Sequence, residues 1–216
     1  MLRMAKTPKI YIDAAKAFRC DTCAANQAKP QTHKVSRPHR YYFGHEVGID
    51  VFEIHDVTGK HYSILNAVDM GTTFDQAWIV RVSDTHGSPS SSACLKAFDQ
   101  GWVRWAGWPK YVACDRGVHN RGIFAKTMSA NSVRVRPAGL ESPEQIGRVE
   151  RRNQMLKNMM KKVIKETHAI GEEAMGMILT ECLNAINEMT RHGGFAPCQW
   201  VLSKLPRAPA TQGDEE

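Results

Sequence analysis

The chain has 216 residues, of which 42% are hydrophobic and 24% are charged, so it can bury a core and does not have the composition of a disordered protein. No stretch approaches the roughly 20 apolar residues that cross a bilayer, and the first residues lack the apolar run of a signal peptide. We therefore expect no membrane partner and an intracellular protein, nuclear if the host is eukaryotic.

The net charge of +7 is concentrated at the start of the chain. Residues 1–42 hold nine Lys or Arg and two Asp or Glu, which is +7, so residues 43–216 sum to zero. Within this neutral part, residues 148–165 hold seven basic residues and one acid, Glu150. Two basic surfaces suit a polyanion, although a solvated tail and a solvated helix face explain either patch alone equally well.

Three apolar runs in the first half predict strands. The run over 46–54 is apolar on both faces, which is typical of a central strand, and it contains Asp50. Runs over 62–68 and 76–82 follow short turns that contain glycine. The three strands are therefore expected to form an antiparallel meander.

The second half alternates helices and strands and then becomes helical. Proline at the first helical position and glycine at the end mark the helix boundaries. The expected elements are a helix from Pro89 to Gly107, a strand over 111–115, a helix over 120–130, a strand over 132–136, a helix from Pro143 with a possible hinge at Gly147, and a helix over 172–191.

Three carboxylates lie where regular elements would present them. Asp50 is an acid inside an apolar strand, Asp115 stands at a strand exit beside a glycine turn, and Glu150 lies on a helix, 34 residues further on. Brought together, they would hold two hard divalent cations, which suits phosphodiester chemistry. Taken singly, Asp115 also fits the start of a turn and Glu150 a solvated helix position.

The helix that carries Glu150 is expected to have two distinct faces. Its apolar stripe consists of Val149, Leu156, Met160 and Val163. A neighbouring face carries Glu150, Gln154, Lys157 and Lys161. One helix thus offers a metal ligand and two cations for phosphate, with simple solvation as an equal alternative for the two lysines.

The order of elements and several motifs resemble the catalytic core of integrases. The segments are Val47-Gly-Ile-Asp50, Ala67-Val-Asp69, Asp115-Arg-Gly117, Gly147-Arg-Val-Glu150-Arg-Arg-Asn153 and Gly194-Phe-Ala-Pro197. They are similar to those of retroviral and long-terminal-repeat retrotransposon integrases, nearest the gypsy type. The resemblance implies an α/β, ribonuclease H-like fold with a five-stranded mixed sheet flanked by helices.

By this resemblance the protein would be a DDE-type integrase, a polynucleotidyl transferase that uses two Mg²⁺ or Mn²⁺ ions for 3′-end processing and strand transfer. The catalytic, metal-binding residues would be Asp50, Asp115 and Glu150. Contacts to DNA are assigned to Arg148, Arg151, Gln154, Lys157 and Lys161. The partners would be retrotransposon DNA ends and target DNA, and the enzyme would be a homo-oligomer. Asp69 also matches a family position, but we interpret it as structural.

The cysteines divide into a close pair and four single residues. Cys20 and Cys23 have the spacing of half a zinc site and resemble the end of the integrase module that binds Zn²⁺ through two histidines and two cysteines. In this chain the histidines come later, at His33 and His39, so Zn²⁺ is expected only if further ligands precede the chain. The others, expected to be reduced and mostly buried, are Cys94, Cys114, Cys182 and Cys198.

These observations predict a basic N-terminal segment over 1–42, which is a remnant of a zinc-binding module, a catalytic core over 43–207 and a disordered tail over 208–216. The alternative to an active enzyme is an inactive or domesticated integrase remnant that binds nucleic acid. The intact triad favours the enzyme, and the incomplete zinc module favours the remnant. A ribonuclease H that cuts RNA in hybrids is less favoured, because it would call for another carboxylate set and the motif around Glu150 resembles that of integrases.

Overall fold

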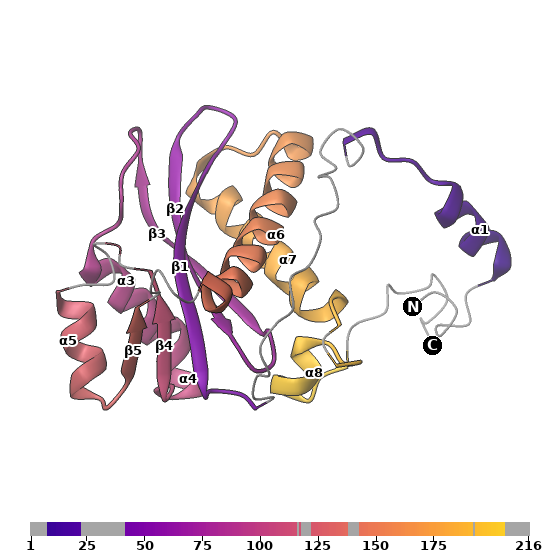
Figure 1. Ribbon diagram of the computed structural model, residues 1–216. Coiled ribbons are helices and arrows are strands. Elements are labelled where there is room, and N and C mark those ends of the chain that lie inside the picture. The colour runs from indigo at the N-terminus through magenta and orange to yellow at the C-terminus, as the bar shows by residue number, and fades with distance from the viewer. Residues whose placement is uncertain are drawn as a thin grey trace.

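The computed structural model describes residues 8–22, 42–115, 117, 122–137, 143–191 and 193–205, and its centre is a five-stranded sheet (Figure 1). The strands are β1 (Glu46–His55), β2 (His61–Asp69), β3 (Asp75–Ser83), β4 (Tyr111–Cys114) and β5 (Arg134–Pro137). Their order is β3-β2-β1-β4-β5. Strands β1, β2 and β3 pair antiparallel, whereas β4 pairs parallel with both β1 and β5, so the sheet is mixed.

Helices cover both faces of this sheet. They are α3 (Ser91–Phe98), α4 (Arg104–Ala106), α5 (Ile123–Ala130), α6 (Pro143–Thr167), α7 (Gly171–Met189) and α8 (Pro197–Leu202), with a π-helical turn over Asp99–Val103 between α3 and α4. A further helix, α1 (Lys9–Ala17), buries none of its residues. Helices α6 and α7 pack on one face, and α3 and α5 on the other (Figure 1). None of the described helices is long and apolar enough to cross a membrane.

Strand β1 is central because both of its faces are buried. Phe52 and Ile54 pack against α6 and α7, whereas Val47 and Ile49 belong to the core formed with α3 and α5. Successive side chains of a strand point to opposite faces, so a strand covered on both sides is apolar throughout. Asp50 is a polar residue on the face that α6 covers.

The starts of α3 and β5 differ from those expected for identifiable reasons. The Ser90 hydroxyl accepts a hydrogen bond from the Ala93 amide at 3.1 Å, so α3 begins after this cap and not at Pro89. Strand β5 begins at Arg134, because Ser132 has a φ of 58°, a left-handed conformation that a strand does not contain.

Helix α6 runs without a break through Gly147. Its buried apolar stripe consists of Val149, Leu156, Met160 and Ile164. The prediction that Val163 belongs to this stripe is wrong, since 36% of this side chain is exposed. Steps of three and four residues both return to the same side of a helix with 3.6 residues per turn, and it is Ile164 that packs in the core with residues of α7.

The four single cysteines are free and buried, as expected: Cys94, Cys114, Cys182 and Cys198. Burial raises the pKa of Cys94 to about 11, and it does the same for Cys182, where the nearby Glu181 adds to the effect. These thiols therefore stay protonated at neutral pH, and their role is packing.

Candidate active site

Asp50 and Asp115 are brought side by side by the parallel pairing of β1 with β4. In this pairing Ile49 lies opposite Cys114, and the next residue on each strand is the aspartate. Burial, together with the charges of Asp115 and Asp50, raises the pKa of the Cys114 thiol to about 12. Two of the three expected acids thus share one position along the sheet.

Backbone amides orient both carboxylates. Asp50 Oδ1 accepts a hydrogen bond from the Val51 amide at 2.8 Å, and Asp115 Oδ1 accepts one from the Gly117 amide at 3.0 Å. The second contact is typical of an Asp-x-Gly turn. Asp115 therefore both forms this turn and belongs to the candidate site.

Helix α6 docks on β1 through the turn that contains Glu150. A Cβ at Gly48 would collide with Val149 Cγ2, so glycine permits this close approach. One turn later Asn153 Nδ2 donates a hydrogen bond of 2.6 Å to Asp50 Oδ2. Glu150 lies between these two contacts, three residues before Asn153 and therefore on the same side of the helix, and its side chain is exposed.

Asp50 is positioned by Asn66 and Asn153, two residues that were not predicted to have a role. Asn66 lies opposite Asp50 in the pairing of β1 with β2, and its Nδ2 donates a hydrogen bond of 2.7 Å to Asn153 Oδ1. This bond fixes the amide of Asn153 so that its own NH₂ group faces Asp50. A signal was available: Asn66 interrupts the apolar run over 62–68, and Asn153 comes four residues after Val149, where the buried stripe continues.

No protein family model and no curated protein matches this sequence. Solved structures do match. The HTLV-2 integrase catalytic core domain, in complex with magnesium in a trimeric form, has a TM-score of 0.58 at 16% identity and covers 74% of this chain and 98% of its own. The simian T-cell lymphotropic virus intasome in complex with PP2A regulatory subunit B56 gamma matches with a TM-score of 0.62 at 17% identity. This match covers 97% of this chain and 77% of the matched chain.

The catalytic core domain of BIV integrase has a TM-score of 0.55 at 15% identity, over 74% of this chain and 95% of its own. The chain has the fold of a retroviral integrase catalytic core. The predicted α/β, ribonuclease H-like fold with a five-stranded mixed sheet flanked by helices is therefore confirmed.

The two arginines predicted to contact DNA, Arg148 and Arg151, lie in the first half of α6. Arg148 is half-buried and donates from Nη1 to the Met70 carbonyl oxygen at 3.1 Å. Arg151 is exposed, and its Nε donates to the Gly147 carbonyl oxygen at 2.9 Å. Arg148 thus links α6 to the turn after β2, whereas Arg151 presents its charge to solvent.

The other three predicted DNA contacts follow along α6. Gln154 is exposed, and its Nε2 donates to Asn158 Oδ1 at 2.7 Å. Lys161 is exposed and Lys157 is half-buried. Burial lowers the pKa of Lys157, and the neighbouring Lys161 lowers it further. All five predicted residues therefore lie on one helix, and their contact with DNA stays a prediction.

Asp69 is enclosed by hydrogen bonds at the end of β2. Its Oδ1 accepts from the Gly44 amide at 2.9 Å, and its Oδ2 accepts from both the amide and the hydroxyl of Thr72 at 2.7 Å. Its side chain is fully buried. These contacts hold the turn after β2 and the segment before β1, in keeping with the structural interpretation of this residue.

The predicted zinc half-site falls mostly outside the described residues. Cys20 is described and is half-buried, whereas Cys23, His33 and His39 lie outside the described ranges. The division into an N-terminal segment, a core and a tail also stays a prediction, with residues 206–216 outside the described part of the chain.

Proposed function

We propose that the chain is an integrase-type polynucleotidyl transferase of a gypsy-type retroelement, which carries out 3′-end processing and strand transfer on DNA. The observation that carries this proposal is the placement of Asp50 beside Asp115, with Asn153 of the helix that bears Glu150 hydrogen-bonded to Asp50. The fold of retroviral integrase cores supports it.

The donor set fits a hard divalent cation. Asp50, Asp115 and Glu150 offer carboxylate oxygens from β1, the end of β4 and α6, and such oxygens are the ligands that Mg²⁺ and Mn²⁺ prefer. The HTLV-2 core was itself solved in complex with magnesium. Two such ions, when bound, activate the attacking oxygen and stabilise the leaving oxygen.

The chain's own residues position the ligands and the DNA. Asn153 and the Gly117 amide keep the two aspartates oriented. The cations of α6 extend from Glu150 along the helix, so DNA that binds them passes the carboxylates, and its binding should weaken with salt. We also propose a homo-oligomer, because two DNA ends must meet one target; the HTLV-2 core was solved in trimeric and dimeric forms.

The decisive experiment uses the purified chain and labelled DNA duplexes with a free 3′-hydroxyl. A branched duplex that mimics the joined product serves as a second substrate, for the reverse reaction. We expect cutting or joining with Mg²⁺ or Mn²⁺ and none with EDTA. We also expect no protein–DNA adduct on a denaturing gel, because metal ions held by the three carboxylates would activate water or a DNA hydroxyl and no side-chain nucleophile would be needed.

Three results would overturn the proposal. Joining that persists in EDTA, or that traps DNA covalently on the protein, would exclude the metal-dependent mechanism. Salt-sensitive DNA binding with no cutting or joining of either substrate would instead identify the chain as an inactive, nucleic-acid-binding integrase remnant.

Asn153→Ala is expected to weaken the apparent affinity for Mn²⁺ by about 10- to 100-fold, the usual effect of removing a group that orients a metal ligand. Asp50 loses its 2.6 Å hydrogen bond in this variant and turns more freely. Mn²⁺ titrations followed by electron paramagnetic resonance, with thermal unfolding as a check on folding, measure the effect. Asn158→Ala, on the same helix, is the matched control. Equal Mn²⁺ affinity in both variants would contradict the positioning role.

A further inference from the structure

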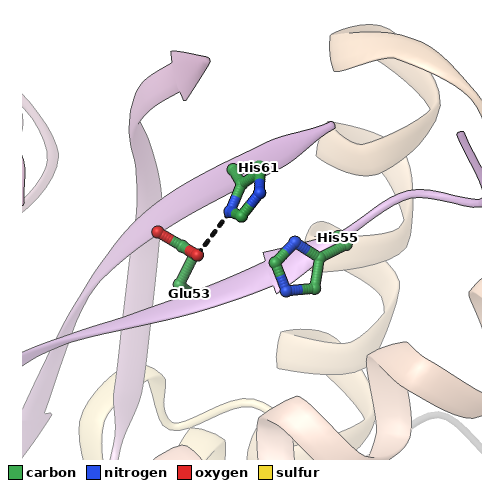
Figure 2. A group of neighbouring side chains, drawn as sticks. All are labelled: Glu53, His55 and His61. Carbon is green, nitrogen blue, oxygen red and sulfur yellow. Dashed lines mark hydrogen bonds and ion pairs between the residues drawn. The ribbon is translucent and has the colours of Figure 1, made fainter. Parts of the chain in front are cut away.

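A second group of potential metal ligands lies on the β1–β2 hairpin, away from the carboxylates described above. His55 and His61 are direct partners in the pairing of the two strands, and Glu53 precedes His55 by two residues. Their side chains therefore share one face of the hairpin (Figure 2). One ligand atom from each of the three lies within 4.8 Å of the others. Glu53 is three residues from Asp50, about 10 Å along the strand and on the opposite face.

The imidazoles converge on one carboxylate oxygen. His61 Nδ1 lies 2.5 Å from Glu53 Oε1, and Nδ1 of His86, from the segment after β3, lies 2.8 Å from the same oxygen. The rings of His55 and His61 are perpendicular, with centroids 4.3 Å apart. Two imidazoles thus contact one carboxylate oxygen, and the third, that of His55, lies beside His61.

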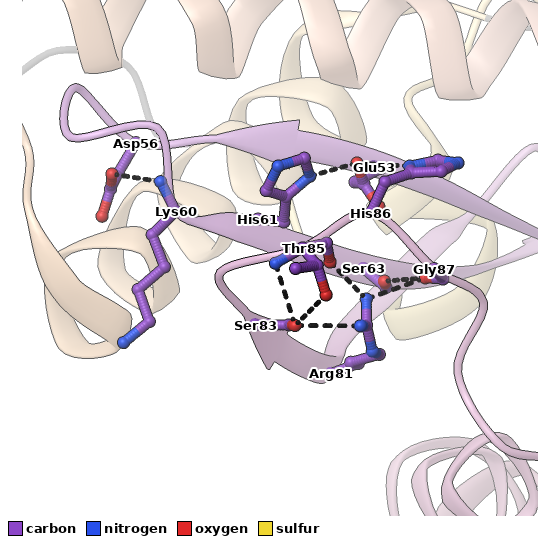
Figure 3. A network of polar contacts seen from close by, with 10 residues as sticks. All are labelled: Glu53, Asp56, Lys60, His61, Ser63, Arg81, Ser83, Thr85, His86 and Gly87. Atoms are coloured by element: carbon purple, nitrogen blue, oxygen red, sulfur yellow. Dashed lines mark hydrogen bonds and ion pairs between the residues drawn. The ribbon is translucent and has the colours of Figure 1, made fainter.

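The segment that carries His86 is held in place by Arg81 of β3 (Figure 3). Arg81 Nη1 donates to the carbonyl oxygens of Thr85 at 3.1 Å and Gly87 at 3.0 Å, on either side of His86. Its Nη2 donates to the Ser83 hydroxyl at 2.9 Å. The position of His86 above Glu53 is therefore set by a hydrogen-bonded turn, although the imidazole itself is exposed.

We propose that Glu53, His55, His61 and His86 bind one Zn²⁺ ion. Imidazole nitrogen and carboxylate oxygen are common zinc ligands, and four of them complete the tetrahedral shell of a structural site. With bonds of about 2.0–2.1 Å, tetrahedral ligand atoms stand about 3.3 Å apart. The two contacts to Glu53 Oε1, at 2.5 and 2.8 Å, are shorter than this value, and the ligand atoms of Glu53, His55 and His61 lie within 4.8 Å of one another, so closing the site requires side-chain rotation, including that of the exposed His86.

Charges of both signs lie near the cluster, and only the negative charge favours a bound cation. Glu53 supplies the negative charge, whereas Lys157 and Lys161 of α6 act on His55 with positive charge. Both lysines are on flexible stems and can turn toward solvent. A bound ion would join β1, β2 and the segment after β3. It would thereby stabilise the β1–β2 hairpin.

The test is a calorimetric titration of the full chain with Zn²⁺, after removal of metal, in a Cys20→Ser, Cys23→Ser background that excludes the thiol pair. We expect one tight equivalent and a higher melting temperature with Zn²⁺. His55→Gln and His61→Gln should each lower the affinity by at least about 100-fold, because a ligand is lost. His168→Asn, which replaces an exposed histidine outside the cluster, should leave it unchanged.

His55→Gln keeps the test decisive if His61→Gln folds poorly, because His55 is exposed. Zinc binding that is equal in the parent and in His55→Gln would place the ion elsewhere and overturn the proposal. No binding by the parent chain would leave the cluster as a hydrogen-bonded group alone. A Glu150→Gln chain should retain the zinc equivalent, so this result is independent of the proposed catalytic function.

Discussion

Replacing Glu150 by glutamine is expected to reduce DNA strand transfer by at least about 10³-fold, because the amide has nearly the same shape but loses the charge that a metal ligand supplies. The effect on folding should be small. The Glu150 side chain is exposed, and exposed substitutions away from special contacts usually change the free energy of unfolding by less than about 0.5 kcal/mol. We therefore expect this variant to lose strand-transfer activity and to keep its stability.

The measurement compares the rate of joining with Mg²⁺ and with Mn²⁺, and the melting temperature, in parallel with Glu181→Gln. Glu181 is an exposed glutamate in the middle of α7, so its substitution removes the same charge from a different helix. Equal rates in the two variants would remove Glu150 from the active site. A large loss of stability in Glu150→Gln alone would mean that the carboxylate serves the fold.

Arg152→Met is expected to lower the free energy of unfolding by about 3–5 kcal/mol at pH 8, the usual result of removing one partner of a buried ion pair. Arg152 turns inward from α6, with its side chain 11% exposed, and its Nε lies 3.5 Å from Oδ2 of the fully buried Asp75. It also donates to the Thr73 carbonyl oxygen at 2.5 Å. Without Arg152, a carboxylate would stay in the core with no cation beside it.

The loss should depend on pH in a defined direction. Burial raises the pKa of Asp75 from 3.8 to about 7, although Arg152 opposes this effect. A folded-state pKa above the unfolded value stabilises the fold below about pH 4, and this contribution is lost as the pH rises through 7. Removing Arg152 takes away the opposing cation, so the destabilisation should be smaller at pH 5 than at pH 8.

Urea unfolding at both pH values, followed by tryptophan fluorescence, measures this difference. Arg151→Met is the matched control, because the adjacent arginine is exposed and its loss should change the free energy of unfolding by less than about 0.5 kcal/mol. A loss in Arg152→Met no larger than in this control, or one that does not grow with pH, would contradict the importance of the buried pair.

Much of the fold could be predicted from local patterns. The apolar runs predicted the three antiparallel strands, because a short continuous apolar run bounded by turns is a signal within the strand itself. The stripe on α6 was predicted apart from its last member, where a three-residue and a four-residue step both fit the sequence and the position of α7 selects Ile164 over Val163. Helix starts were less certain, since the choice of Ser90 as the cap depends on one hydrogen bond.

The residues of the candidate site could be predicted from the sequence, but most of the contacts between them could not. Asp50, Asp115 and Glu150 were chosen from their motifs, and the pairing of β1 with β4 places the first two side by side. The contact of Asn153 with Asp50 joins residues 103 apart in the chain, so no local pattern predicts it. Likewise, Arg151 and Arg152 are identical neighbours in the sequence, and only the packing of α6 on the sheet makes one exposed and the other buried.

The sequence by itself determined the strands, the principal helices and the three acids, because side-chain periodicity and motif spacing are local properties of the chain. Only the tertiary structure decided which polar groups meet: the link from Asn66 through Asn153 to Asp50, the buried pair of Arg152 with Asp75, and the histidines around Glu53. The physical reason is that hydrogen bonds and ion pairs depend on distances of about 3 Å between side chains, and the packing of the helices on the sheet sets those distances.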